Sequence, residues 1–143
     1  MSSNQEYTVE LGFLKHKPVI KLITGLSNDL KEEVLEKFKI SLNMHGVQNE
    51  RIHSIKCTSS LFTPNDILNR IKGLLVEGKM SYVFLHEIQN LPHFDILLLE
   101  LLKLRFIDVY AISSSDICNY GSLLENLKGK YKEIHILPKS YKD

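Results

Sequence analysis

Hydrophobic residues recur along this chain with two different spacings, and the two spacings alternate. Short runs rich in β-branched and other apolar residues are typical of strands, and segments with apolar residues three and four positions apart are typical of helices. The segments expected as strands are 18–24, 51–56, 81–85, 107–112 and 133–137. The segments expected as helices are 29–44, one that begins after Thr63, 94–104 and 122–127. Segment 51–56 alternates polar and apolar residues, which indicates a sheet edge, whereas 81–85 has apolar residues at both odd and even positions, which indicates a central strand covered on both sides.

Strands separated by helices predict an α/β fold. We expect a mainly parallel five-stranded sheet with helices on both faces and right-handed crossovers. In such sheets ligands bind outside the carboxyl ends of the strands, near the point where the strand order reverses. Candidate chemistry is therefore expected at 25–32, 86–87 and 113–116. The chain fits a single domain over residues 1–143, with residues 1–15 as a candidate flexible tail.

Composition narrows the class of protein. The 18 Lys and Arg residues are balanced by 17 Asp and Glu residues, so the net charge of +1 gives no general attraction to a polyanion. The two cysteines, Cys57 and Cys118, match no metal-binding spacing and form no disulfide framework. The sequence has no secretory signal pattern and no apolar run of the roughly 20 residues that span a bilayer. We expect a soluble, cytoplasmic domain without a membrane partner.

The turn after segment 18–24 partly fits a phosphate-binding P-loop, G-x-x-x-x-G-K-[ST]. Gly25 and Lys31 occupy the first glycine and the lysine of this pattern. Leu30 replaces the second glycine, and Glu32 replaces the hydroxyl residue that holds magnesium. Asp29 and Glu32 have the spacing of acidic helix-capping residues, so their carboxylates compete with a triphosphate for the amides of the helix N-terminus. An ordinary capped helix is the structural alternative to a nucleotide site.

Polar residues also follow the third and fourth expected strands. His86 stands where a P-loop ATPase has an Asp that holds magnesium, and Glu87 stands where the water-activating Glu is expected. A neutral imidazole is a poor ligand for Mg²⁺, which prefers oxygen. A zinc site made of His86, Glu87 and His93 is a minor alternative, because their spacing matches no compact zinc motif. Residues 113–116 fit either a phosphate site or an ordinary turn.

Three longer stretches resemble one known family, the N-terminal ATPase domain of a prokaryotic AAA-type P-loop ATPase family whose members usually continue into a nuclease-like C-terminal domain. Residues 82–92, YVFLHEIQNLP, are similar to the family's Walker B signature FLDEIQN. Residues 107–115, IDVYAISSS, are similar to its sensor strand DIYITGSSS, and residues 127–138, LKGKYKEIHILP, to LSGRYVEIEVLP. The resemblance extends from about Lys15 to the end and implies a P-loop NTPase-like three-layer sandwich.

The resemblance also implies a nucleotide site from which this chain departs. The positions that keep a functional residue type are Gly25, Lys31, Glu87 and Ser114. Gly25, Lys31 and Ser114 imply nucleotide binding. Glu87 implies a catalytic base only if the domain is active. The positions that depart from the family are Leu30, Glu32, His86 and Lys130. Lys130 replaces an Arg expected to act on a neighbouring subunit's nucleotide, and it lacks the planar guanidinium that grips a phosphoryl group.

These departures predict a catalytically inactive domain that acts as a binding or regulatory module. Magnesium coordination, phosphate binding and a trans-acting cation are each worth orders of magnitude in phosphoryl transfer. We therefore expect no resident cofactor, with ATP and Mg²⁺ both disfavoured. The expected partner is a second copy of this chain or an intact AAA-type relative.

Three other interpretations stay open at this point. One is a residual ATP-binding protein or weak ATPase that uses Lys31 and Glu87. Another is a nucleic-acid-binding module, which is disfavoured because the basic C-terminal segment lacks an aromatic stacking platform. The lysines of that segment are Lys128, Lys130, Lys132, Lys139 and Lys142. The last interpretation is a decayed fragment with no function of its own.

Overall fold

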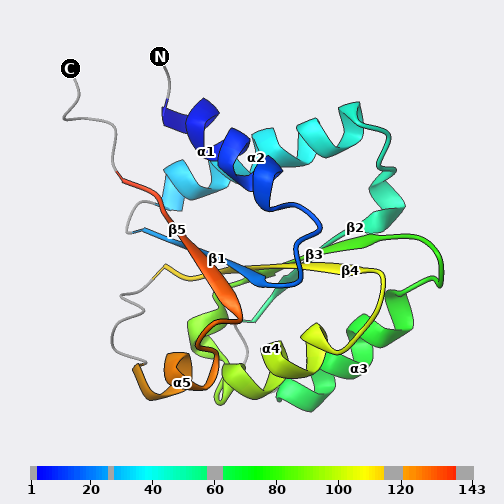
Figure 1. Ribbon diagram of the computed structural model, residues 1–143, viewed down its shortest axis with the longest axis vertical. Helices are drawn as coiled ribbons and strands as arrows, with labels where there is room; N and C mark the ends of the chain where they lie inside the picture. Colours follow the sequence, from blue (N-terminus) through cyan, green and yellow to red (C-terminus); the bar gives the residue numbers. More distant parts are fainter. Residues whose placement is uncertain (1–2, 26–27, 58–62, 115–120, 138–143) are drawn as a thin grey trace.

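The described residues form a five-stranded parallel sheet with the strand order β2-β3-β4-β1-β5 (Figure 1). This computed structural model describes residues 3–25, 28–57, 63–114 and 121–137. The strands are β1 (Ile20–Thr24), β2 (Ile52–Lys56), β3 (Ser81–His86), β4 (Ile107–Ile112) and β5 (Tyr131–His135). The expected strand 51–56 lies at a sheet edge, and the expected central strand 81–85 lies between two neighbours with every residue buried. The predicted parallel α/β sheet is therefore confirmed.

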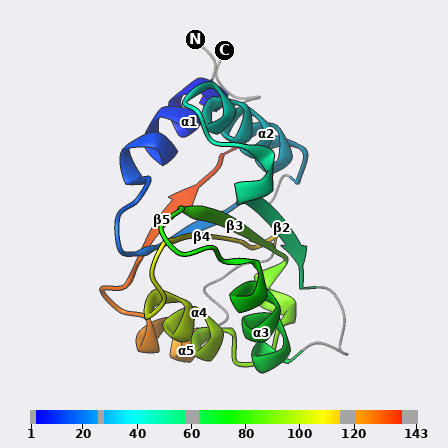
Figure 2. The ribbon, with the colours of Figure 1, turned by 90° about the vertical axis from the view of Figure 1, so that its right-hand side faces the viewer.

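Helices cover both faces of this sheet, as Figure 2 shows most clearly. The helices on one face are α1 (Ser3–Leu14) and α2 (Asn28–Met44), and those on the other are α3 (Pro64–Leu74), α4 (Phe94–Leu102) and α5 (Gly121–Asn126). Two short 3₁₀ helices, η1 (Asn49–Arg51) and η2 (Ile88–Asn90), lie in connections. The arrangement is the expected three-layer sandwich.

The alternation of side chains along the strands gives each face its own core. In β1, Leu22 faces α3 and α4, whereas Ile23 faces α1 and α2. On the second of these faces, Phe38 of α2 packs against Phe84 of β3 and Tyr110 of β4, with ring centroids 6.2 and 5.3 Å away. These buried aromatic contacts fix α2 across the sheet, and α2 begins at the candidate site.

Helix boundaries follow local capping chemistry. Thr63 accepts a hydrogen bond from the Asp66 amide, and the Asp66 carboxylate accepts one from the Thr63 amide, both at 3.1 Å. This capping box, with Pro64 at the first helical position, explains why α3 starts where the sequence predicts. The helix expected over 94–104 ends earlier, at Leu102, where Lys103 is the C-cap. The last strand is shifted from the expected 133–137 because Tyr131 already pairs with Ile20 of β1.

Within residues 1–15, the candidate flexible tail, residues 3–14 form the helix α1, which the sequence analysis did not predict. Leu11 of this helix is fully buried against α2, and the Tyr7 hydroxyl accepts a hydrogen bond from the Leu137 amide. Apolar residues of α1 point both inward and outward, since Phe13 is 74% exposed. The helix therefore has no clear apolar face, and periodicity could not reveal it.

Within the described residues, no helix combines the length and the apolar character needed to cross a membrane.

Candidate functional site

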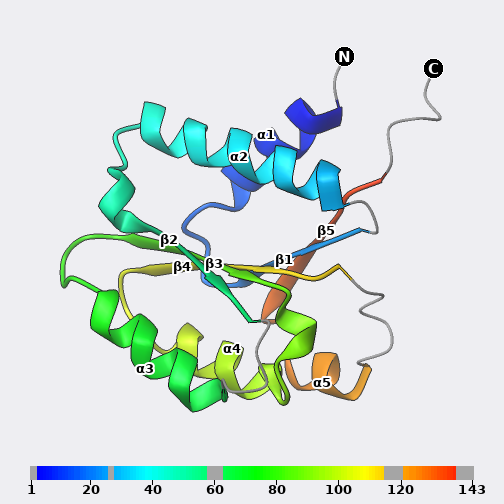
Figure 3. The same cartoon turned by 180° about the vertical axis from the view of Figure 1, so that it is seen from behind.

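The candidate site lies where the strand order reverses. β1 sits between β4 and β5, so the chain leaves β1 and crosses over β4 and β3 to reach β2 (Figure 3). The Ser113 amide donates to the Ile23 carbonyl at 2.9 Å, which holds the ends of β4 and β1 together. This geometry gathers Gly25, Glu87 and Ser114 at one edge, as expected for a switch point in an open α/β sheet.

Lys31, in the first turns of α2, points its ammonium group back at these strand ends. The residue is 2% exposed, and its Nζ donates to the carbonyl oxygens of Gly25 at 2.5 Å and Ser113 at 2.9 Å. Burial lowers the pKa of Lys31, while the charges of Glu87 and Glu32 act in the opposite direction. Lys31 therefore lies at the ends of β1 and β4, and in this structure its ammonium group donates to backbone carbonyls.

Glu87 is held by two side chains at the end of β3. Its Oε1 accepts hydrogen bonds from Ser114 Oγ at 2.7 Å and from Gln89 Nε2 at 2.8 Å. Burial opposes ionisation, but these hydrogen bonds and the nearby Lys31 outweigh it and lower the pKa of Glu87. The backbone of Glu87 is left-handed, with φ of 59°, which is uncommon for a residue with a side chain. The structure therefore positions an ionised carboxylate beside the buried Lys31.

The two positions expected to hold magnesium face each other. His86 Nδ1 lies 3.9 Å from a Glu32 carboxylate oxygen, and the His86 side chain is only 12% exposed. Burial lowers the pKa of His86, and the positive charges of Lys39 and Lys56 add to this effect, against Glu32 and Glu87. The imidazole is therefore neutral at physiological pH and offers one nitrogen in place of the oxygen that Mg²⁺ prefers.

The expectation that acidic residues occupy the amides of the α2 N-terminus stays a prediction. Residues 26 and 27 lie outside the described part of the chain, as do Asp116 and Cys118. Glu32 is 64% exposed at its side chain and lies beside His86, and Asp29 is exposed. The two acidic residues are thus positioned on the surface of the first turn of α2.

Two other positions of the P-loop pattern have structural roles. Gly25 has φ of 137°, and a Cβ there would lie 2.5 Å from the Ile136 carbonyl oxygen, so only glycine fits without a shift. Leu30, which replaces the second glycine, is 8% exposed and belongs to the core cluster that contains Val34 and Leu35. Where the P-loop pattern has glycine, the Leu30 side chain therefore packs in the hydrophobic core.

Lys130 lies at the other end of the sheet. Its carbonyl oxygen accepts a hydrogen bond from the amide of Ile20, the first residue of β1, whereas Gly25 follows the last residue of that strand. A five-residue strand is roughly 17 Å long. Lys130 is therefore too far from Lys31 to act on this chain's own site, and the trans-acting role that the resemblance implies stays a prediction.

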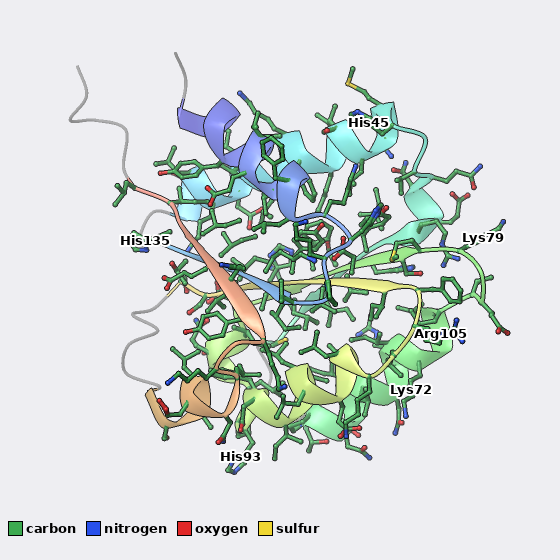
Figure 4. The ribbon with its side chains drawn as sticks, in the orientation of Figure 1. His45, Lys72, Lys79, His93, Arg105 and His135 are labelled. Atoms are coloured by element: carbon green, nitrogen blue, oxygen red, sulfur yellow. The ribbon has the colours of Figure 1, made fainter. Side chains whose placement is uncertain are left out.

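The zinc alternative gains no support from the structure. His93 is exposed at the start of α4, at the lower edge of the molecule in Figure 4. Among the described residues, no three His, Cys, Asp or Glu side chains gather closely enough to hold a metal ion.

Sequence reasoning missed two polar features. Gln89 lies within the Walker B-like stretch, but its contacts with Glu87 and Ser114 depend on the adjacency of β3 and β4, which the sequence did not specify. The second feature is a buried ion pair between Lys21 of β1 and Asp108 of β4, with 2.5 Å between Nζ and Oδ1. The sequence did carry a signal for this pair, because Lys21 and Asp108 are each a charged residue inside a mainly apolar strand segment.

This buried pair anchors the segment that joins α1 to β1. Lys21 Nζ also donates to the Lys17 carbonyl at 2.7 Å, and Asp108 Oδ2 accepts from the His16 amide and the Tyr110 hydroxyl, both at 2.9 Å. His16 Nε2 lies 2.5 Å from the Tyr82 hydroxyl. The cluster lies under α1, away from Lys31, and ties the N-terminal helix to the sheet.

Comparison with known structures finds the same fold in several solved chains. A chain of Drosophila ORC, solved bound to DNA, has a TM-score of 0.65 at 11% identity, over 95% of this chain and 90% of that chain. A DNA polymerase III γ subunit-related protein from Thermotoga maritima gives 0.66 at 14% identity, over 98% of this chain and 48% of that one. A second Drosophila ORC structure, with AT-rich DNA and Cdc6, gives 0.64 at 12% identity, over 98% and 58%.

At these identities the structural matches establish the fold alone, and the chain spans only about half the length of the last two chains. Curated proteins give no significant sequence match. A model of the AAA domain family, however, matches residues 26–143, which include Lys31, Glu87 and Ser114. The chain therefore belongs to the AAA domain family, and its fold is that of an AAA-type P-loop ATPase domain.

Proposed function

We propose that this chain is a catalytically inactive AAA-type domain that serves as a binding or regulatory module. The observation that carries the proposal is the pairing of Glu32 with His86, 3.9 Å apart, at the two positions where an active site holds magnesium. A carboxylate and a neutral imidazole 3.9 Å apart do not reproduce a hydroxyl and a carboxylate arranged around a hydrated Mg²⁺. The residues present do not fit the metal, and they therefore support no metal-dependent hydrolytic step.

The environment of Lys31 supports the same proposal. To bind a triphosphate, its Nζ must leave the carbonyl oxygens of Gly25 and Ser113, to which it donates at 2.5 and 2.9 Å. Each hydrogen bond to a charged group is worth about 1.5–3 kcal/mol, and the vacated carbonyls then need new donors. Contacts between Lys31 and phosphate must therefore first compensate for the free energy of these two lost hydrogen bonds. Glu32, which lies close enough to influence the pKa of Lys31, also repels an anion.

The competing function is residual ATP binding with weak hydrolysis. It is favoured by one observation, the survival of Lys31 beside an ionised Glu87 that Ser114 and Gln89 hold in place. A helix N-terminus with a lysine remains an anion site in principle. The two functions differ in their dependence on magnesium, which makes them separable by experiment.

The decisive experiment is calorimetric titration of the wild-type chain with ATP, with and without Mg²⁺, together with a hydrolysis assay. We expect no hydrolysis and no gain in affinity from Mg²⁺. The matched variant carries Leu30→Gly, Glu32→Thr and His86→Asp, which restores the family pattern, and should gain Mg²⁺-dependent ATP binding if the fold has only lost these groups. Hydrolysis by the wild type that Lys31→Ala abolishes would overturn the proposal.

As a module, the domain is proposed to bind a second copy of itself or an intact AAA-type relative. Lys130 lies at the end of the sheet opposite Lys31. This position supports an association in which the Lys130 end of one domain packs against the Lys31 end of its neighbour. Sedimentation of the wild type and of Lys130→Glu tests this association, because the charge reversal is expected to weaken it. Unchanged association of Lys130→Glu would exclude this face as the contact.

A further inference from the structure

Asp95, in the first turn of α4, is a buried carboxylate outside the candidate nucleotide site. The residue is 5% exposed, and its Oδ2 accepts a hydrogen bond from Asn126 Nδ2 of α5 at 2.8 Å. Its Oδ1 is shielded from solvent and has no hydrogen-bond partner within the part of the chain that the structure describes. A carboxylate oxygen in such a place loses its hydration without gaining a donor, which disfavours the arrangement that buries it.

The helix that contacts this carboxylate is α5, which lies beside the first turns of α4 (Figure 3). α5 has six residues, none of them buried, and Leu123 and Leu124 are partly buried against the core. Leu127, directly after the helix, is 1% exposed and fixes the chain to the core. α5 therefore has a firm anchor at its carboxyl end and a weaker attachment along its length.

The place of Asp95 at the start of α4 does not remove the unfavourable effect of its burial. A helix N-terminus attracts a carboxylate through its free amides and its dipole. This attraction acts on Asp95 whether or not α5 lies over it. The loss of hydration at Oδ1, in contrast, arises only when α5 is packed against α4. Asp95 therefore stabilises α4 in either position of α5 and opposes the packed position.

We propose that α5 is a flap that opens from α4, and that the buried carboxylate of Asp95 keeps the closed and open positions close in free energy. A six-residue helix is unstable by itself in water, so opening unfolds α5 while Leu127 holds the end of the segment. In the open position Asp95 regains its hydration. The fold thus contains an element of low local stability that a small change in contacts moves.

Hydrogen exchange of the intact chain, resolved by NMR, measures this opening. The amides of Leu127 and Lys128 donate to the carbonyls of Leu124 and Glu125 in α5, at 2.9 and 3.2 Å, so they become free to exchange when α5 unfolds. In the wild type we expect these two amides to exchange faster than the amides of α2, whose aromatic contact with the sheet opens only with the whole domain.

Two variants should change the exchange of these two amides in opposite directions. Asp95→Asn keeps the shape and an acceptor for Asn126 but removes the charge, so exchange should slow about tenfold. Asn126→Ala leaves the carboxylate without its donor, so exchange should become about tenfold faster, although alanine favours a helix. Glu125→Ala, an exposed change on α5, is the matched control and should exchange like the wild type.

The opposite signs separate a flap from a purely structural contact. If the contact between Asp95 and Asn126 only stabilised α5, both variants would speed exchange. Exchange in Asp95→Asn that is as fast as in the wild type, or faster, would therefore overturn the proposal. Wild-type amides at Leu127 and Lys128 that exchange only with global unfolding would overturn it as well. ATP hydrolysis by the wild type would contradict the inactive function alone, because the flap does not depend on it.

Discussion

Replacing Asp108 by alanine should destabilise the fold more than any surface change, because it isolates a buried positive charge. The Lys21 and Asp108 side chains are 0% and 1% exposed. The substitution leaves the Lys21 ammonium without its counter-ion and removes the acceptor of the His16 amide and the Tyr110 hydroxyl. Breaking a buried pair from one side costs about 3–5 kcal/mol. For 143 residues the entropy of unfolding implies a fall in melting temperature of roughly 10–15 °C.

Urea denaturation followed by circular dichroism measures this loss directly. The matched control is Glu100→Ala, which removes one partner of an exposed pair with Lys103, where the loss of stability should be far smaller because solvent screens both charges. The double variant Lys21→Met with Asp108→Leu removes both charges and should recover much of the lost stability, since an apolar pair of similar volume replaces a buried ion pair at little cost. Equal stability of Asp108→Ala and Glu100→Ala would refute the reasoning.

The pH dependence gives an independent check of the same cause. Burial already lowers the pKa of Lys21 below 10.5, and Asp108 opposes this effect, so Asp108→Ala lowers the pKa further. Between that lowered pKa and 10.5, the unfolded chain binds more protons at Lys21 than the folded chain does, so stability rises with pH. The variant should therefore recover part of its deficit relative to wild type in alkaline buffer. A deficit that stays constant with pH would mean that the loss does not come from Lys21.

Three further outcomes are expected. Thr63→Ala removes a capping box and should cost about 1 kcal/mol of unfolding free energy in urea denaturation. Gly25→Ala places a methyl group 2.5 Å from the Ile136 carbonyl oxygen at a φ of 137°, so its melting temperature should fall, whereas an unchanged value would mean that the turn relaxes freely. Burial raises the pKa of Cys57 from 9.0 to about 11, so in a Cys118→Ser background its thiolate fraction, and with it the rate of alkylation, should be about a hundredfold lower than in urea.

Periodicity predicted the sheet well, because β1, β3 and β4 are buried along nearly their whole length and are mainly apolar. The run 82–85 is apolar at every position since helices cover both sides of β3. The spacing of Gly25 and Lys31 picked out two residues that lie together in the structure, where Lys31 Nζ donates to the Gly25 carbonyl. These features are local in sequence or depend on burial alone.

The features that sequence reasoning missed depend on which strands become neighbours. Gln89 contacts Ser114 only because β3 and β4 pair in parallel, and Lys21 meets Asp108 only because β1 pairs with β4. A one-dimensional pattern does not specify that order. Helix α1 was missed for a different reason, since Leu11 and Phe13 point to opposite sides and leave no apolar stripe.

The place of β1 in the sheet has a consequence for how the chain acquires its shape during synthesis. Of the five strands, β1 leaves the ribosome before the others, yet its two neighbours in the sheet, β4 and β5, are made after β2 and β3. Until they appear, β1 has no strand to pair with, and closing so long a stretch of chain slows folding. The nascent polypeptide therefore carries an unpaired, aggregation-prone strand until β4 and β5 are made, and chaperones that recognise extended apolar segments should engage it there.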